Sequence, residues 1–289
     1  MPFDSLPSSD TFPQLSIQSS GQFAGAFAPA LRVSGAWGDT LWRRRLMRST
    51  RYISRDELFR VYGAILFANY MGEVLNVEMT IAWKLANIYE PEAVTRALDL
   101  FLGRFRKFAA HRKFRTCYYT VHENDRKIGY HTHLALHVPD KYRDVFHRWW
   151  RGIETELDKG RDPEDIIFVK FHKEDAVHSQ WRWFQYCMKG LDPNLAKSEA
   201  KREGWEKLDT NTLAGVWRRE TGRIPMKRVR LALAMGKKAQ RDACYKQPFY
   251  IQNVRHEYKY SDAEYRRGLF ERNETLRETV KALNSMDLI

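Results

Sequence analysis

The chain has 289 residues, of which 43 % are hydrophobic and 13 % aromatic, which is enough to bury a sizeable core. Lysine and arginine outnumber aspartate and glutamate by 49 to 36, and the net charge of +13 favours a polyanionic partner, with nucleic acid as the first candidate. The three cysteines form no C-x-x-C pair, which argues against a cysteine zinc site and a disulfide framework. The sequence contains no apolar run of transmembrane length and no secretory signal, so we expect a cytoplasmic protein without a membrane partner.

The start of the chain changes abruptly in composition. Residues 1–38 are rich in Ser, Pro, Gly and Ala and nearly uncharged, which predicts a mobile tail. The next segment, "WRRRLMRSTRYISR", carries six arginines in fourteen residues. Its cluster at 43–51 is a candidate for contact with a nucleic-acid backbone, and a solvated basic face is the alternative. A helix is expected to follow over residues 55–70.

Hydrophobic periodicity and turn residues predict the elements in the middle of the chain. They are strand 73–83, helix 91–112, strands 114–123 and 129–139 joined as a hairpin by "NDRKIG", helix 140–157, strand 165–172 and helix 179–191. This β-α-β-β-α-β-α order is ferredoxin-like and predicts an α+β fold, with a mainly antiparallel sheet and helices packed on one face.

The pattern changes beyond about residue 205. A basic helix over 226–243 and a charged helix over 261–285 are expected there, and the basic helix is a second candidate for backbone contact. We therefore divide the chain into the tail 1–38, a domain 39–205 and a basic, mostly helical accessory region 206–289.

The segment "GYHTHLALHVP" (129–139) holds three of the nine histidines of the chain. Alternate side chains of a strand share a face, so His131, His133 and His137 point one way, while Thr132 and the leucines point toward the core. Imidazole is the commonest protein metal ligand, and two rings at this spacing can converge on one ion. The alternative is a pair of surface histidines on a half-exposed strand.

A third ligand would complete such a site. Glu123 ends the preceding strand of the hairpin, and Glu78 lies on the polar side of the first strand. Strand alternation does not choose between them, because both faces of 114–123 carry apolar residues. Two imidazoles and a carboxylate suit Mg²⁺ or Mn²⁺, and imidazole also tolerates Zn²⁺, Co²⁺ or Ni²⁺.

The stretch "WRWFQYCMKG" places Tyr186 and Lys189 three residues apart, on one face of the expected helix. A tyrosine has an ordinary pKa near 10, so a nucleophilic role needs a positive charge close by. Lys189 would provide that charge. The alternative is that Tyr186 packs in the core with the other aromatic residues of this helix.

These motifs, in this order, resemble those of the HUH endonucleases. "HTH" on a strand and "YCMK" on a later helix are similar to the second and third motifs of that family, and "VEMTI" with Thr80 is similar to the first. The resemblance covers roughly residues 74–193 and is nearest to the single-tyrosine replication initiators of rolling-circle plasmids. Thr132 stands where the family usually has a hydrophobic residue.

The resemblance implies a fold, a site and a reaction. His131, His133 and Glu123 would hold Mg²⁺ or Mn²⁺, Tyr186 would attack a phosphate of single-stranded or origin DNA, and Lys189 would assist it. The product would be a 5′-phosphotyrosine and a free 3′-hydroxyl, and the reverse reaction would rejoin strands.

No P-loop motif is present, so a host helicase is expected to open duplex DNA. A DNA-binding regulator that does not cut, a single-tyrosine transposase and an unrelated basic interaction protein remain alternatives.

Overall fold

The computed structural model describes residues 49–157, 166–173, 175–195, 220–246 and 262–286. The predicted tail 1–38 and residues 43–48 of the arginine cluster lie outside these ranges. The elements that position the site are α2 (Arg55–Tyr70), β1 (Val77–Ala82), α3 (Pro91–His111), β2 (Tyr118–Asp125), β3 (Gly129–Leu136), α4 (Arg143–Leu157), β4 (Ile167–Phe171), α5 (Ala176–Cys187), the 3₁₀ turn η3 (Met188–Gly190), β5 (Val229–Leu231), α8 (Lys237–Asp242) and α10 (Asp262–Met286).

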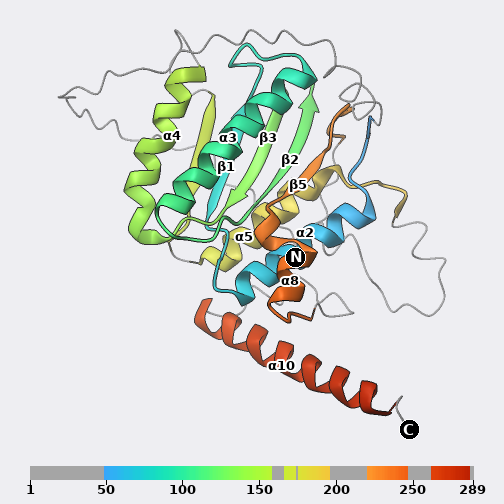
Figure 1. Ribbon diagram of the computed structural model, residues 1–289. Helices are drawn as coiled ribbons and strands as arrows, with labels where there is room; N and C mark the ends of the chain where they lie inside the picture. Colours follow the sequence, from blue (N-terminus) through green and yellow to red (C-terminus); the bar gives the residue numbers. More distant parts are fainter. Residues whose placement is uncertain (1–48, 158–165, 174, 196–219, 247–261, 287–289) are drawn as a thin grey trace, which may run out of the picture. The chain divides into compact units, whose positions relative to one another are not determined.

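The strands form one antiparallel sheet in the order β4-β1-β3-β2-β5 (Figure 1). The predicted α+β class and the order β-α-β-β-α-β-α are confirmed. In space, β3 lies between β1 and β2, and α3 and α4 provide the crossovers, as in a split β-α-β arrangement. The two histidines of "HTH" are therefore on the central strand.

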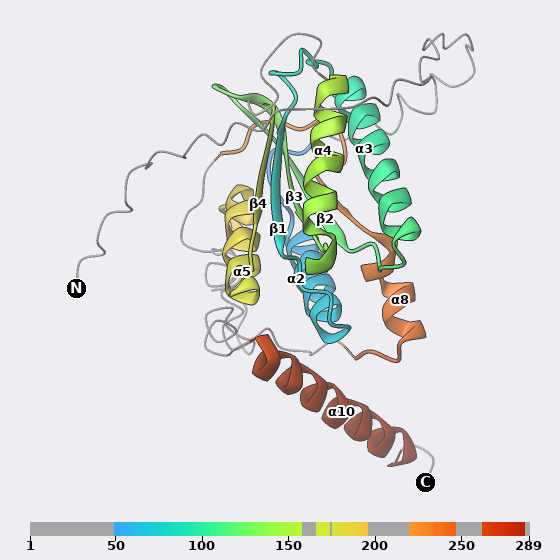
Figure 2. The same ribbon diagram turned by 90° about the vertical axis from the view of Figure 1, so that its left-hand side faces the viewer.

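Helices α3 and α4 cover one face of this sheet (Figure 2). Helix α3 begins with Pro91 in its first turn and buries a stripe of apolar residues that includes Phe105. The Phe105 ring packs against the rings of Tyr118 on β2 and Phe146 on α4, with centroids 6.3 and 6.0 Å away. We call this side of the sheet the packing face.

Helices α5 and α2 lie on the opposite face, which corrects the expectation that helices pack on one face only (Figure 2). Tyr62 of α2 contacts Trp181 of α5, with ring centroids 5.3 Å apart. The indole Nε1 of Trp183 on α5 donates to the carbonyl of Leu134 on β3, at 2.9 Å. Residues such as Tyr119 and Ala135 are fully buried beneath this layer. The strands therefore need cover on both sides, and we call this second side the histidine face.

The predicted helix over 226–243 is wrong in its first half. Residues 229–231 form β5, in which Val229 pairs with Val121 of β2. A 3₁₀ turn, η4 (Leu233–Met235), follows, and only 237–242 are α-helical. The segment also alternates with period two, which suits an edge strand. The guanidinium of buried Arg228 donates to the carbonyls of Thr50 and Gly222, so the strand is anchored to two other segments. The predicted boundary near 205 lies outside the described residues.

The predicted charged helix over 261–285 is present as α10. It contacts α2, where the Asn69 side-chain amide donates to the phenol oxygen of Tyr265 at 3.3 Å. Among the described residues, no helix is both long and apolar enough to cross a membrane.

Candidate metal centre

The β2–β3 hairpin sets the geometry of the site. The Asp125 carboxylate accepts hydrogen bonds from the backbone N–H groups of Lys127 and Ile128, which closes the turn. Strand β2 runs to Asp125, two residues further than predicted, and this length places Glu123 directly opposite His131. Residues that pair in this way point to the same face of a sheet. The hairpin therefore brings Glu123 to the imidazole side.

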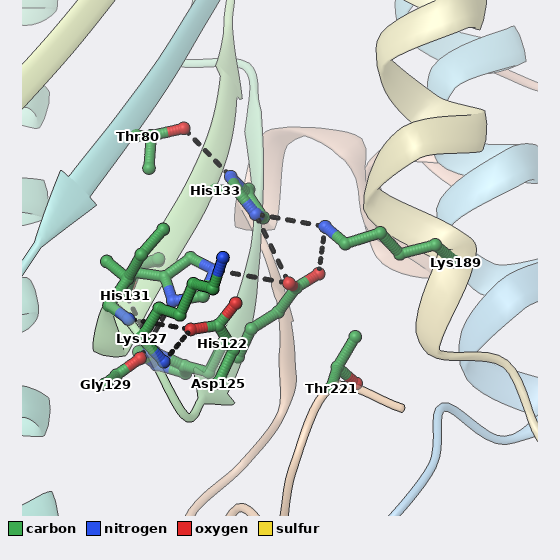
Figure 3. A network of polar contacts seen from close by, with 12 residues as sticks. Thr80, His122, Asp125, Lys127, Gly129, His131, His133, Lys189 and Thr221 are labelled. Atoms are coloured by element: carbon green, nitrogen blue, oxygen red, sulfur yellow. Dashed lines mark hydrogen bonds and ion pairs between the residues drawn. The ribbon is translucent and has the colours of Figure 1, made fainter. Parts of the chain in front are cut away.

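Glu123, His131 and His133 meet on the histidine face. Figure 3 shows the two imidazoles and the side chain of Lys189 that reaches toward them. Oε2 of Glu123 lies 3.2 Å from Nε2 of His131 and 3.5 Å from Nε2 of His133. Two atoms that each bind one ion at about 2.1 Å are separated by about 3.0–3.4 Å, so this spacing fits a shared cation. The donor set of two nitrogens and a carboxylate oxygen suits a divalent metal. It is the one such group of three among the residues that the structure describes.

Two further candidates from the sequence, Glu78 and His137, contact residues outside the cluster. Glu78 lies opposite Ala135, and its carboxylate accepts from Nε2 of His172 at 2.7 Å. His137 lies beyond the end of β3, where its Nε2 is 2.7 Å from Glu73. The choice that the sequence left open therefore falls on Glu123.

The outer nitrogen of each cluster histidine is held in place by a hydrogen bond. Nδ1 of His131 lies 2.9 Å from the carbonyl of Gly129, and Nδ1 of His133 lies 2.9 Å from Oγ1 of Thr80 (Figure 3). A carbonyl can only accept, so Nδ1 of His131 carries a proton, and Nε2, which contacts Glu123 in this structure, would have to lose its own proton to bind a metal. The same orientation holds His133 if Thr80 accepts. Thr80, which only the resemblance had singled out, thus touches the site.

Burial and charge shape the titration of the cluster, in which all three residues are buried. Burial alone would raise the pKa of Glu123, but hydrogen bonds from His131 and His133 and the charge of Lys189 hold that pKa well below its ordinary value. Burial lowers the pKa of His133 to about 4, although Glu123 opposes this shift. Near neutral pH, the carboxylate is ionised and His133 is neutral, which is the state that binds metal.

Lys189 lies just after α5, in η3, and its side chain turns back over the cluster. Its Nζ is 2.7 Å from Oε1 of Glu123 and 3.3 Å from Nε2 of His133. The following residue fixes the turn. The Gly190 carbonyl accepts from the N–H of Ile53, and a Cβ on Gly190 would lie 2.3 Å from Oγ1 of Thr221. Only glycine allows this close approach, so the turn that carries Lys189 is held from two sides.

Tyr186 lies on the histidine face beside the cluster and is 48 % exposed. Its ring centroid is 5.2 Å from that of His133, and Nζ of Lys189 lies 3.7 Å from its centroid. The ring also stacks on Trp183, at 5.1 Å and 13°. The prediction had not assigned Trp183 a place, although an aromatic residue three positions before Tyr186 is a signal for it. Tyr186 is thus neither buried in the core nor turned to the packing face.

Thr132, the polar residue between the two histidines, points to the packing face and is fully buried. Its Oγ1 accepts from the indole Nε1 of Trp83 at 2.6 Å and lies 2.8 Å from Nδ1 of His122. A hydroxyl has one donor and two acceptor sites, so the direction of its bond with His122 is set by the tautomer of that imidazole. These two bonds satisfy the hydroxyl, so a polar residue is accommodated at this position.

The site therefore consists of a candidate metal cluster, a lysine in contact with it and an exposed tyrosine at its edge. Comparisons of the chain with protein-family models, curated proteins and solved structures find no match.

Proposed function

We propose that the chain nicks and joins single-stranded DNA by metal-dependent transesterification, in the manner of the replication initiators that it resembles. One observation carries the proposal. The ligand atoms of the buried residues Glu123, His131 and His133 all lie within 4.8 Å of one another, and the exposed ring of Tyr186 lies beside them. Ligand, nucleophile and positive charge are thus available on one face of a rigid sheet. The net charge of +13 suits a polyanionic substrate.

Mg²⁺ or Mn²⁺ is the proposed ion, and His131, His133 and Glu123 are its proposed ligands. A divalent cation bound there would supply Lewis-acid polarisation of a phosphate oxygen. Three protein ligands leave coordination positions for water or phosphate. The hydrogen bonds of Gly129 and Thr80 orient the two rings, since outer partners of this kind fix metal-binding histidines.

In the proposed reaction, the phenol oxygen of Tyr186 attacks the phosphorus. The new bond joins that oxygen to the 5′-phosphate, the bond to the 3′-oxygen breaks, and the phenol proton is released as the 3′-oxygen gains one. The ammonium of Lys189 is close to the ring on which negative charge must develop. A later attack by a 3′-hydroxyl on the phosphotyrosine would restore the strand and free Tyr186.

The test is formation of a covalent adduct. Single-stranded oligonucleotides labelled at the 3′ end are incubated with the protein and Mn²⁺, and labelled protein is detected after denaturation. We expect an adduct that Tyr186→Phe abolishes, because the variant keeps the ring and loses the attacking oxygen. Tyr89→Phe is the matched control, since Tyr89 is 55 % exposed and lies in the loop after β1. An adduct that survives in Tyr186→Phe would exclude this tyrosine as the nucleophile.

A regulator that binds DNA without cutting it is the second candidate. The contact between Lys189 and Glu123 favours it, because an ammonium at 2.7 Å can neutralise the carboxylate without any metal. Binding of the same oligonucleotides with no adduct under any metal would support this function. Joining of transposon hairpin ends, rather than of a replication origin, would support a transposase. For a replication initiator, a host helicase is the proposed partner for opening the duplex.

A further inference from the structure

One exposed aromatic residue shares the histidine face with the candidate metal centre. Phe168 on β4 is 53 % exposed. It pairs with Thr80 of β1, and Thr80 in turn pairs with His133 of β3. Paired residues point to the same side of a sheet, so all three side chains form one row on the histidine face. The row starts at a candidate metal ligand and ends at an exposed ring.

The row sets the distance between the ring and the cluster. Neighbouring strands lie about 4.8 Å apart, so the backbones of Phe168 and His133 are separated by about 10 Å. A nucleotide whose phosphate sits at the cluster can extend its neighbouring base over such a span. The position also leaves the ring accessible to a ligand, because β4 is an edge strand of the sheet in the described residues. Phe168 is thus placed to contact the base of the nucleotide next to a phosphate bound at the cluster.

Exposed positive charges lie on β4 itself and on α5, the helix that carries Tyr186. Lys170 is exposed two residues further along β4, on the same face. Arg182 is exposed on α5, one position before Trp183, whose ring stacks on Tyr186. Positive charges that track a backbone, interleaved with aromatic rings, are typical of single-stranded nucleic-acid sites. An apolar ring on an edge strand without such a role invites aggregation, and proteins usually place charges there instead.

We propose that Phe168 is a stacking platform for the nucleobase adjacent to the phosphate bound at the Glu123–His131–His133 cluster. The substrate class is single-stranded nucleic acid. Stacking on a ring tolerates any base, because every base has a π face, so Phe168 contributes affinity and position rather than sequence preference. The phosphate register rests on the proposed function, whereas the stacking itself needs no cleavage.

The experiment compares two strands that differ only in their bases. One is a labelled oligodeoxyadenylate, and the other is a base-free deoxyribose phosphate strand of equal length. Binding of each is measured by fluorescence anisotropy at one fixed salt concentration. Wild type is expected to bind the base-bearing strand more tightly. Phe168→Leu, which keeps an apolar side chain and removes the ring, is expected to weaken that binding by about fivefold or more and to leave base-free binding unchanged.

Two further variants make the test specific. Phe168→Trp should bind the base-bearing strand at least as tightly as wild type, because it restores a stacking surface. Phe270→Leu is the matched control, since Phe270 is 54 % exposed but lies on α10, and it should leave binding of both strands unchanged. Equal losses for both strands in Phe168→Leu, or equal losses in the two leucine variants, would overturn the proposal.

Failure of this inference is separable from failure of the proposed function. If Phe168→Leu binds both strands like wild type while the Tyr186 adduct still forms, the stacking platform is wrong and the nicking function stands. Another outcome is that no adduct forms while Phe168→Leu still loses affinity for the base-bearing strand alone. The stacking role of Phe168 is then supported, in a protein that binds nucleic acid without cutting it. The tighter binding of the base-bearing strand could be lost in Phe168→Leu only when Mn²⁺ is present. This result would also support the platform, because the metal-bound phosphate would then position the base on the ring.

Discussion

The two faces of the sheet have very different contents, although the same strands supply both. On the packing face, the Phe105 ring of α3 lies among aromatic neighbours from β2 and α4, on the other side of the sheet from the cluster. On the histidine face, the strands present a buried carboxylate, two imidazoles and an exposed phenylalanine. Strand β3 contributes to both through alternation, with His133 on one side and Thr132 on the other. The comparison indicates that stability and chemistry are divided between the faces.

A crossed pair of substitutions tests this division with the largest expected effects. His131→Ala removes one proposed ligand and should weaken Mn²⁺ binding by at least about 100-fold, since loss of even an outer partner costs about 10–100-fold. Phe105→Ala should lower the free energy of unfolding by roughly 3–5 kcal/mol, because it leaves a cavity in a packed layer. Its folded fraction should bind Mn²⁺ like wild type. Calorimetry and denaturant unfolding measure the two quantities.

His137→Ala provides the control for the histidine substitution. His137 follows the same strand, but it contacts Glu73 and the carbonyl of Val74. Its loss should reduce stability and leave Mn²⁺ binding intact. Equal Mn²⁺ binding by wild type and His131→Ala would remove the proposed metal site. Weak Mn²⁺ binding by folded Phe105→Ala would show that the two faces are not separable.

Local patterns predicted the hairpin and the two imidazoles on one face, because a strand repeats every two residues. They did not decide between Glu123 and Glu78. That choice depends on where the turn falls, and β2 continues to Asp125, so the register became known only from the pairing. A short segment of mixed apolar and basic residues fits both a strand and a helix. The predicted helix over 226–243 is therefore wrong at its start, where Val229 begins a strand.

Contacts between distant segments escaped prediction altogether. The placement of α5 and α2 on the histidine face depends on contacts such as that between Tyr62 and Trp181, which lie far apart in the chain. Phe168 looked like any residue of a strand until its row with Thr80 was known. No local pattern contains this information, because it depends on the order of strands in the sheet.

The pH dependence of stability sharpens the comparison, because each face buries a histidine. Burial lowers the pKa of His122 on the packing face to about 3 and that of His133 on the histidine face to about 4. Between the ordinary histidine value of about 6.5 and these values, the unfolded chain binds protons that the folded chain does not. The free energy of unfolding therefore falls as the pH drops, by at most about 1.4 kcal/mol per pH unit for each group. The pKa of Glu123 is also lowered in the folded chain, so below its ordinary value this carboxyl adds to the loss of stability.

Replacing His122 by asparagine isolates the packing face. The Asn side chain keeps an acceptor for the Thr132 hydroxyl but has no titrating group. We expect the loss of stability from pH 7 to pH 5 to be smaller in His122→Asn than in wild type by about 1–2 kcal/mol. Denaturant unfolding at both pH values measures the difference. Identical losses in the two proteins would mean that the lowered pKa of His122 does not cause the loss of stability at acid pH.

The smallest expected effect concerns Lys189 and has the opposite sign. In the folded chain its ammonium lies 2.7 Å from Glu123, so it competes with a cation for the charge of the carboxylate. Lys189→Met keeps the unbranched stem and removes the charge. We expect Mn²⁺ to bind about tenfold more tightly, equal to ~1.4 kcal/mol, and the yield of the Tyr186 adduct to fall. Binding and chemistry would then change in opposite directions.

Lys170→Met is the control for this substitution, because Lys170 is exposed on the same face of the sheet. It should leave Mn²⁺ affinity unchanged, which would show that proximity to the carboxylate matters rather than net charge. Weaker Mn²⁺ binding by Lys189→Met would reverse the interpretation. The hydrogen bond from Lys189 would then hold Glu123 in its ligand orientation, and the lysine would belong to the metal centre as a positioning residue rather than as a competitor.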